Sequence, residues 1–395
     1  MFIGENLLNL RVMHGYSRKQ LAEMIYVSEQ AIWQYENYYT TPKLQNINEL
    51  KTIFNVKRLY FYREDMLKRD ERSDNIPLMN IAYRSNTMNV ISKTQTEANH
   101  LEYLDAFVNY ITEKISVPTQ NVIQLRGKCI DYLNHTTDSR KTQIEMIAKY
   151  ARGWIGLDTD SNDRLMFLIE KSGVFIFEKA IGEDIDTYSL WTYENRPFII
   201  LGNLKRSAVR RNFDLAHELG HLLLHYKVEF THLDKSGYKE IEKEANLFAG
   251  AFLLPEEAFL EDMKQIGRKT NPDAYMDMKQ KWSTSLQVLG YRAVNLDVLT
   301  AREHRNYYAA LHRRDYLKCE PLDEVLPIKR PQKVKSIFDL VMKRDVINFE
   351  KMLAEDWLIE VEFLYRLTGI DSDFFRNYFT KRDRIAENNG EIIAF

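Results

Sequence analysis

The sequence predicts a mainly α-helical protein of the α+β class, with a small β-sheet set between helical segments. Three observations predict this class. Apolar residues recur at helical spacing in residues 1–57 and 98–155, β-type apolar runs are confined to residues 165–201, and the chain after Arg210 is mainly helical with breaks at prolines. At 395 residues the chain exceeds one ordinary core, so we expect two or three domains.

Composition excludes several classes of protein. Hydrophobic residues make up 45% and charged residues 28% of the chain, as in globular proteins and unlike disordered ones. The sequence has no signal-like N-terminus and no apolar run long enough for a membrane span, so we expect a cytoplasmic protein without membrane contact. The two cysteines, Cys129 and Cys319, are far apart, and we expect both to be reduced core thiols. A net charge of −2 restricts any DNA contact to a local surface.

The N-terminal residues predict a small helical bundle. A first amphipathic helix covers residues 6–13, and Ser17 and Ser28 are placed to cap a second and a third helix. In the third helix polar positions alternate with the apolar Ala31, Ile32 and Tyr35, so its polar face has the form of one that enters a DNA major groove. The residues we expect at the DNA are Gln20, Ser28, Glu29, Gln30, Trp33 and Gln34.

This bundle resembles the XRE family of helix-turn-helix domains. The residues that carry the resemblance are Ser17-Arg-Lys-Gln20-Leu-Ala22, Val27-Ser28, Ile32, Tyr35-Glu36, Pro42 and Leu50. The resemblance implies DNA binding, with Gln20 at a phosphate or base contact and Gln30 and Gln34 on the recognition helix. Such readers commonly pair two half-sites, which leaves a homodimer open.

Two positions depart from the XRE pattern, and the charge is low. Tyr26 stands where the family usually has Gly in the turn, and Asn37 stands where Gly follows the Tyr-Glu pair. Residues 1–57 hold six Lys and Arg against five Glu, a weak attraction for phosphates. A helix-turn-helix that serves in dimerisation or peptide binding is therefore the alternative.

Changes in composition predict the domain boundaries. We expect the helix-turn-helix domain at residues 1–70, a charged and polar linker at 71–97, a second domain at 98–325 and a helical C-terminal region of unknown role at 326–395. Aromatic residues recur at helical spacing in this last region. We expect them in a core, although a surface for a partner or signal is the alternative.

The segment His217-Glu-Leu-Gly-His221 has the spacing of a zinc site on a helix. Residues four apart lie on one helix face, so both imidazoles can reach one ion, and Glu218 lies beside them. Catalytic zinc takes three protein ligands and leaves one position for water. We therefore expect His217 and His221 as zinc ligands and Glu218 as the catalytic base.

A second helical segment, residues 241–249, offers the third ligand. We expect Glu242 to bind the metal and Asn246, one turn later, to hydrogen-bond a histidine ring. Glu244 competes, but it points about 200 degrees away from Glu242 around the helix. Two solvated glutamates are the alternative to a ligand. His225 continues the spacing, yet three ligands on one helix diverge too far for one ion, so we expect a neighbour or a substrate-side residue.

A segment that covers about residues 142–325 resembles the ImmA/IrrE family of zinc metallopeptidases. The motifs that carry the resemblance are Arg211-Asn-Phe213-Asp-Leu-Ala-His217-Glu-Leu-Gly-His221, Glu242-Lys-Glu-Ala-Asn246-Leu-Phe-Ala249 and Ala251-Phe-Leu-Leu-Pro255. The resemblance implies a zincin-like fold of the gluzincin type, zinc as the cofactor and Glu242 rather than Glu244 as the third ligand. It also implies regulated cleavage of a transcriptional repressor as the activity.

The sequence thus leads to three hypotheses about function. The first is a zinc-dependent endopeptidase that cleaves a transcriptional repressor or a related regulatory protein and is coupled to DNA binding. The second is a transcription regulator whose zincin-like domain senses a ligand or a protein and cleaves nothing. The third is an antitoxin-like or defence partner, which differs mainly in what binds the C-terminal helices. His304, His312 and Asp315 are too widely spaced for a second metal site, and we expect them on the surface or in a core.

Overall fold

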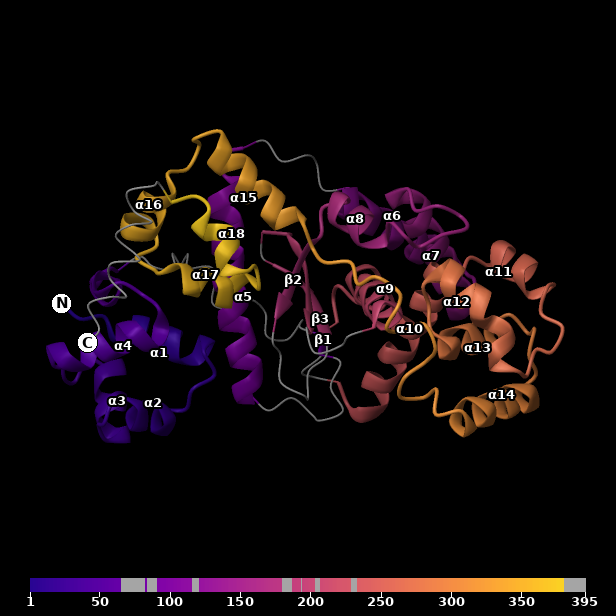
Figure 1. Cartoon of the computed structure of the whole chain (residues 1–395), viewed down its shortest axis with the longest axis horizontal. Helices are drawn as coiled ribbons and strands as arrows, with labels where there is room; N and C mark the ends of the chain where they lie inside the picture. The colour runs from indigo at the N-terminus through magenta and orange to yellow at the C-terminus, as the bar shows by residue number, and fades with distance from the viewer. Residues whose placement is uncertain are drawn as a thin grey trace. The chain divides into compact units, whose positions relative to one another are not determined.

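The computed structural model describes residues 1–64, 82–83, 91–115, 121–179, 187–192, 194–202, 207–228 and 233–379 (Figure 1). The chain divides into two compact units. The first consists of Met1–Leu78, Thr87–Val117 and Val334–Phe395, and the second of Met79–Asn86 and Pro118–Lys333. The prediction of a mainly helical protein with a small sheet is confirmed. None of the helices in the described residues is long and apolar enough to cross a membrane.

The first unit begins with the helix-turn-helix. Its elements are α1 (Gly4–Met13), α2 (Arg18–Met24), α3 (Glu29–Glu36), α4 (Leu44–Phe54) and a 3-10 turn at Arg58–Tyr62. Ser17 caps α2 by accepting from the amide of Gln20, and Ser28 caps α3 by accepting from the amide of Ala31, as the sequence predicts. Gly4 lets α1 approach the end of α3, because a Cβ there would lie 2.3 Å from the carbonyl oxygen of Tyr35.

Helix α5 and the C-terminal helices complete this first unit. They are α5 (Ile91–Thr112), α15 (Lys333–Lys343), α16 (Phe349–Lys351), a π-helical turn at Met352–Asp356, α17 (Val361–Thr368) and α18 (Ser372–Arg376). Val56 forms an antiparallel bridge with Ile359, and Lys57 pairs with Glu360 at 2.7 Å. The aromatic residues predicted as core are mostly buried, whereas Tyr365 is exposed.

This division differs from the boundaries predicted from the sequence. Residues 98–112 lie in the first unit and not with 121–325, and residues 334–379 belong to the same unit as the helix-turn-helix. The cause is aromatic packing across long sequence separations. Phe107 lies against Phe338 and Trp357, and Tyr103 lies against Phe363.

The second unit surrounds a small sheet with helices. Its elements are α6 (Asn121–His135), α7 (Arg140–Ile155), α8 (Leu165–Lys171), β2 (Phe175–Lys179), β3 (Thr187–Trp191), β4 (Pro197–Gly202), α9 (Ala208–Leu224), α10 (Lys235–Leu253), α11 (Glu256–Met263), a 3-10 turn at Pro272–Tyr275, α12 (Met276–Trp282), α13 (Leu286–Asn295) and α14 (Ala301–Arg313). With β1 (Ala82–Tyr83) the strand order is β1-β3-β4-β2. β2 runs parallel to β4, whereas β3 is antiparallel to both β4 and β1.

One predicted strand is wrong. The run Leu165-Met-Phe-Leu-Ile169 forms helix α8 rather than a strand. Phe167 is 54% exposed while its four apolar neighbours are buried, which is the pattern of a helix with one face outward. Because all five residues are apolar, the sequence does not show which of them face outward. It therefore cannot distinguish a helix buried on one face from a strand buried on both faces. The strands predicted at 174–177 and 197–201 correspond to β2 and β4.

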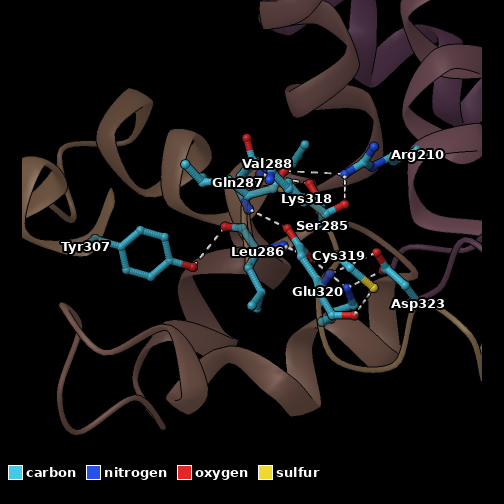
Figure 2. A network of polar contacts seen from close by, with 12 residues as sticks. Arg210, Ser285, Leu286, Gln287, Val288, Tyr307, Lys318, Cys319, Glu320 and Asp323 are labelled. Atoms are coloured by element: carbon cyan, nitrogen blue, oxygen red, sulfur yellow. Dashed lines mark hydrogen bonds and ion pairs between the residues drawn. The ribbon is translucent and has the colours of Figure 1, made fainter. Parts of the chain in front are cut away.

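Buried polar contacts fix the segment that follows α14. The Glu320 carboxylate accepts from the amide of Leu286 at 2.8 Å, at the N-terminus of α13, and the hydroxyl of Tyr307 donates to the carbonyl of Leu286 (Figure 2). Lys279, fully buried, pairs with Glu320 at 2.6 Å and with Asp323 at 2.7 Å. Cys319, expected in a core, is exposed in this segment, whereas Cys129 is buried as expected.

Candidate metal centre

Helices α9 and α10 bring the candidate ligands together. The apolar face of α9 lies in the core of the second unit, and His217, Glu218 and His221 are all buried on this helix. Gly220 lets α10 come close, because a Cβ there would lie 2.9 Å from Cδ1 of Phe248. The first half of α10, which carries Glu242, is thereby held beside the histidines.

The three predicted ligands form one cluster. The Nε2 atoms of His217 and His221 are 3.0 Å apart. Glu242 brings one oxygen to 3.5 Å from Nε2 of His217 and the other to 3.4 Å from Nε2 of His221. In the part of the chain that the structure describes, this is the one group of His, Cys, Asp and Glu side chains close enough to hold a metal. His304, His312 and Asp315 form no such group.

Hydrogen bonds to the far side of each ring orient the two imidazoles. Nδ1 of His217 donates to the amide oxygen of Asn246 at 3.0 Å, which is the contact that the sequence predicts for Asn246. Nδ1 of His221 lies 3.0 Å from Nδ1 of His225, and Nε2 of His225 lies 3.0 Å from a carboxylate oxygen of Glu244. Glu244 therefore points away from the cluster, as its place on the helix predicts.

A surface arginine completes this chain of contacts. Arg140 on α7 donates through Nε and Nη2 to the two oxygens of Glu244, at 2.7 and 2.5 Å. Hydrogen bonds from Arg140 and His225 outweigh burial and lower the pKa of Glu244 to about 2. Burial lowers the pKa of His225 to about 4. Near neutral pH the pair is therefore a charged carboxylate and a neutral imidazole.

The contacts fix which ring nitrogen carries the proton. The Glu244 carboxylate can only accept, so Nε2 of His225 carries the proton and its Nδ1 must accept from His221. When both rings are neutral, His221 keeps a lone pair on Nε2, and so does His217, whose Nδ1 donates to Asn246. The two Nε2 atoms lie 3.0 Å apart. A cation between them removes the repulsion, so two imidazole nitrogens and a carboxylate fit the donor set of zinc.

Two buried carboxylate oxygens that accept no hydrogen bond from the described residues also fit a zinc site. The Oε1 atoms of Glu242 and of Glu218 are buried and accept no hydrogen bond from the described residues. Oε2 of Glu218, in contrast, accepts from the hydroxyl of Ser189 on β3 at 2.6 Å. Burial raises the pKa of Glu218 to about 7. A buried oxygen that accepts no hydrogen bond, on each glutamate, is what a ligand and a proton acceptor require.

Sequence reasoning missed two residues of this site. Ser189 lies on a strand and Arg140 on a helix, both far from residues 217–246 in the sequence. No spacing rule connects them to the motif, since only the fold brings them near it. His225, expected as a neighbour or a substrate-side residue, is a buried neighbour of His221.

In the first unit, the predicted DNA-facing residues lie on or beside α3. Gln20, Ser28, Glu29 and Gln30 are exposed, while Trp33 and Gln34 are half-buried. The amide oxygen of Gln20 accepts from the backbone of Ser17 in a capping box, and the ring of Trp33 stacks on that of Tyr39 at 4.9 Å. DNA contact by these residues stays a prediction.

The two departures from the XRE pattern differ in structure. Tyr26 takes a left-handed φ of 55°, the conformation for which the family uses Gly. At the second position Asn37 has a φ of −104°, and the following residue, Tyr38, is left-handed with a φ of 64°. The turn after α3 is therefore shifted by one residue from the expected Asn37.

Comparison with known protein families agrees with this geometry. Residues 169–294 match the IrrE N-terminal-like domain of the Peptidase M78 family, and residues 7–61 match a helix-turn-helix family. A search of curated proteins found no match. The M78 region includes β2 to β4, α9 and α10, and therefore His217, His221 and Glu242. The chain thus joins an N-terminal helix-turn-helix domain of the XRE type to an IrrE-like domain of the metallopeptidase family M78.

Proposed function

We propose that the protein is a zinc-dependent endopeptidase that cleaves a transcriptional repressor or a related regulatory protein. The observation that carries the proposal is the cluster of two imidazoles, whose Nε2 atoms lie 3.0 Å apart, with Glu242 beside them and Glu218 buried next to them. His217, His221 and Glu242 would hold the zinc. When bound, zinc supplies Lewis-acid chemistry, acidifying water and polarising the scissile carbonyl.

Glu218 supplies the proton transfer. Its Oε1 is free to accept a proton from the attacking water and to pass it to the nitrogen of the leaving amine. The hydroxyl of Ser189 holds the other oxygen, so the carboxylate cannot rotate freely. Burial raises the pKa of Glu218 to about 7, which suits a group that both accepts and donates a proton near neutral pH.

The class of substrate rests on the family and on the domain combination. The ImmA/IrrE family, which the M78 region resembles, implies cleavage of a repressor. The helix-turn-helix in the same chain supports a role in transcriptional regulation, since it provides a DNA-binding module beside the peptidase.

Metal analysis and a single substitution test the proposal. The purified full-length protein and its Glu218→Gln variant should each contain about one zinc ion, because Glu218 is not a ligand in the proposed site. Only the wild type should cleave a repressor encoded beside it. Glu257→Gln, a change at an exposed glutamate on α11, should leave cleavage unchanged. Undiminished cleavage by Glu218→Gln would refute the catalytic assignment.

A non-proteolytic regulator is the second candidate. The chain of contacts from the buried His221 to the exposed Arg140 would also suit a domain that uses bound metal as a structural or sensing element. An assay of regulation in cells distinguishes the two candidate functions. If Glu218→Gln preserves regulation of the target promoter while a variant that loses the metal does not, cleavage is unnecessary and the sensor function holds.

A further inference from the structure

The guanidinium of Arg126 on α6 lies over the ring of Trp191 at the end of β3. The Cζ atom of Arg126 is 3.8 Å from the centroid of that ring and 5.6 Å from the centroid of the Tyr226 ring. Nη2 of Arg126 donates to the side-chain oxygen of Asn195 at 3.1 Å. The arginine and both rings are half-buried, so the guanidinium is held in place and still reaches solvent.

This guanidinium has more hydrogen-bond donors than acceptors around it. A guanidinium carries five N–H donors, and among the described residues Arg126 donates to Asn195 and pairs with no carboxylate. Two buried arginines of the same unit differ. Arg211 pairs with a glutamate, and Arg152, which also lies over a tryptophan ring, donates to four acceptors. Burial lowers the pKa of Arg126, so an anion beside it would stabilise its charge.

Trp191 fixes the place of this guanidinium relative to the proposed base. Trp191 follows Ser189 by two residues on β3, and side chains two apart on a strand point to the same side. The hydroxyl of Ser189 donates to Glu218. The indole of Trp191 donates at 2.9 Å to the carbonyl of Leu222, one turn further along α9. Two strand residues span about 7 Å, so the guanidinium lies on the order of 10 Å from the carboxylate of Glu218.

We propose that Arg126 binds the carboxylate of an aspartate or glutamate side chain of the protein substrate, about two or three residues from the scissile bond. This inference rests on the proposed peptidase function and names a feature of its substrate. A guanidinium fork matches a carboxylate with two parallel hydrogen bonds, and stacking on Trp191 holds the plane of the fork. Arg126 lies outside residues 169–294, so the match to the M78 family does not account for it.

A binding selection tests this inference without catalysis. All proteins are full-length, incubated with zinc, and carry Glu218→Gln, so that no bound peptide is cleaved. The probe is a randomised pool of synthetic peptides with acetylated N-termini and amidated C-termini, and mass spectrometry identifies the peptides that each protein retains. The parent should enrich peptides that contain aspartate or glutamate about tenfold over the starting pool, the fold-change expected of one hydrogen bond between charged groups.

Substitutions of Arg126 separate recognition of a carboxylate from a structural role. Arg126→Gln should abolish the enrichment, and Arg126→Lys, which keeps the charge without the fork, should retain part of it. Arg126→Glu should instead enrich peptides that contain lysine or arginine, a reversal that the loss of a structural contact would not produce. Lys128→Gln is the matched control, because Lys128 lies on the same helix but over the ring of Trp154. It should select the same peptides as the parent.

A second pool with free C-terminal carboxylates distinguishes the two sources of a carboxylate. If Arg126 strengthens binding of this pool alone, without enrichment of aspartate or glutamate, it binds the end of a chain and the side-chain assignment is wrong. Selection by the parent without acidic enrichment, or an enrichment that persists in Arg126→Gln, would also overturn the inference.

Cleavage of the amidated pool by proteins that retain Glu218 locates the acidic residue. The wild type should cut with aspartate or glutamate about two or three residues from the scissile bond, and Arg126→Gln should lose this preference. Cleavage with no acidic preference would overturn the inference and leave the peptidase proposal intact. Acidic enrichment in the binding selection, with no cleavage of the pool or of a repressor by the wild type, would support the carboxylate site and refute the peptidase.

Discussion

The two oxygens of the Glu218 carboxylate have different surroundings, and Ser189 is the cause. Oε2 accepts from the Ser189 hydroxyl at 2.6 Å, while Oε1 accepts nothing from the described residues. A hydrogen bond to a charged group contributes about 1.5–3 kcal/mol. The serine therefore orients the base without touching any of the proposed ligands.

Ser189→Ala should lower the rate of repressor cleavage roughly 10- to 100-fold, the equivalent of that hydrogen bond. Zinc content should not change, since Ser189 contacts no ligand in the proposed site. Single-turnover cleavage and metal analysis measure the two effects. Ser189→Thr keeps a hydroxyl and should retain more activity than the alanine variant. A wild-type rate for Ser189→Ala would contradict the positioning role.

His225 and Glu244 connect His221 to the surface through Arg140. Partners behind a metal-binding histidine commonly change affinity about 10- to 100-fold when removed. His225→Phe keeps a ring but removes the acceptor for Nδ1 of His221, so zinc affinity should fall in that range. Glu244→Gln should weaken zinc binding less, since an amide oxygen can still accept from His225.

Competition with a chromophoric chelator measures these affinities directly. In the double variant the two losses should not add, because both substitutions break the same chain of contacts. Glu257→Gln, an exposed change on another helix, is the matched control. Unchanged affinity in His225→Phe would mean that His225 only fills space.

At the scale of residues, the sequence predicted those site residues that lie one turn apart on the same helix. His217 and His221, and likewise Glu242 and Asn246, lie one turn apart, so spacing alone placed each pair on one face. Ser189 and Arg140 come from other elements, and nothing in their own neighbourhood distinguishes them. Metal binding and DNA contact by the predicted residues remain predictions.

At the scale of elements, the contact between α9 and α10 at Gly220 controls the site. A Cβ at this position would lie 2.9 Å from the buried ring of Phe248. Because Glu242 precedes Phe248 on α10, any separation of the helices moves the carboxylate away from the two imidazoles.

Gly220→Ala should lower the free energy of unfolding by about 1–3 kcal/mol, the usual effect of overpacking. Zinc affinity should fall as well. Gly250→Ala on α10 is the control, because a Cβ there meets no atom within 4 Å. That variant should be as stable as the wild type or about 0.5–1 kcal/mol more stable, since alanine favours helix. Urea unfolding compares the two. A stable Gly220→Ala protein would contradict the close approach.

Elements were predictable where their apolar period was clear. The caps Ser17 and Ser28 located α2 and α3, and apolar runs between polar segments located β2 and β4. Helix α8 was not predictable as a helix, because its five apolar residues show no period. Strand β1 could not be predicted, since two residues carry too little pattern and pairing with β3 alone defines it.

For the whole molecule, long-range pairing decides which segments share a unit. The first unit draws on three stretches of the chain. Contacts such as Val56 with Ile359 and Phe107 with Phe338 join residues more than two hundred positions apart. The apolar periodicity within each stretch predicts its helices, but it does not predict which other elements those helices pack against. The sequence therefore predicted the fold class and the elements better than the grouping of those elements.

The discontinuous first unit has a consequence for synthesis on the ribosome. Residues 334–379, which hold Phe338, Phe363 and Phe375 of its core, are translated long after α1–α4. The second unit, nearly continuous in sequence, is complete once residue 333 has emerged. Domains generally fold as units when their residues become available. The region translated first is thus the last to complete its core, and a nascent chain would gain its peptidase-like half before its DNA-binding half is finished.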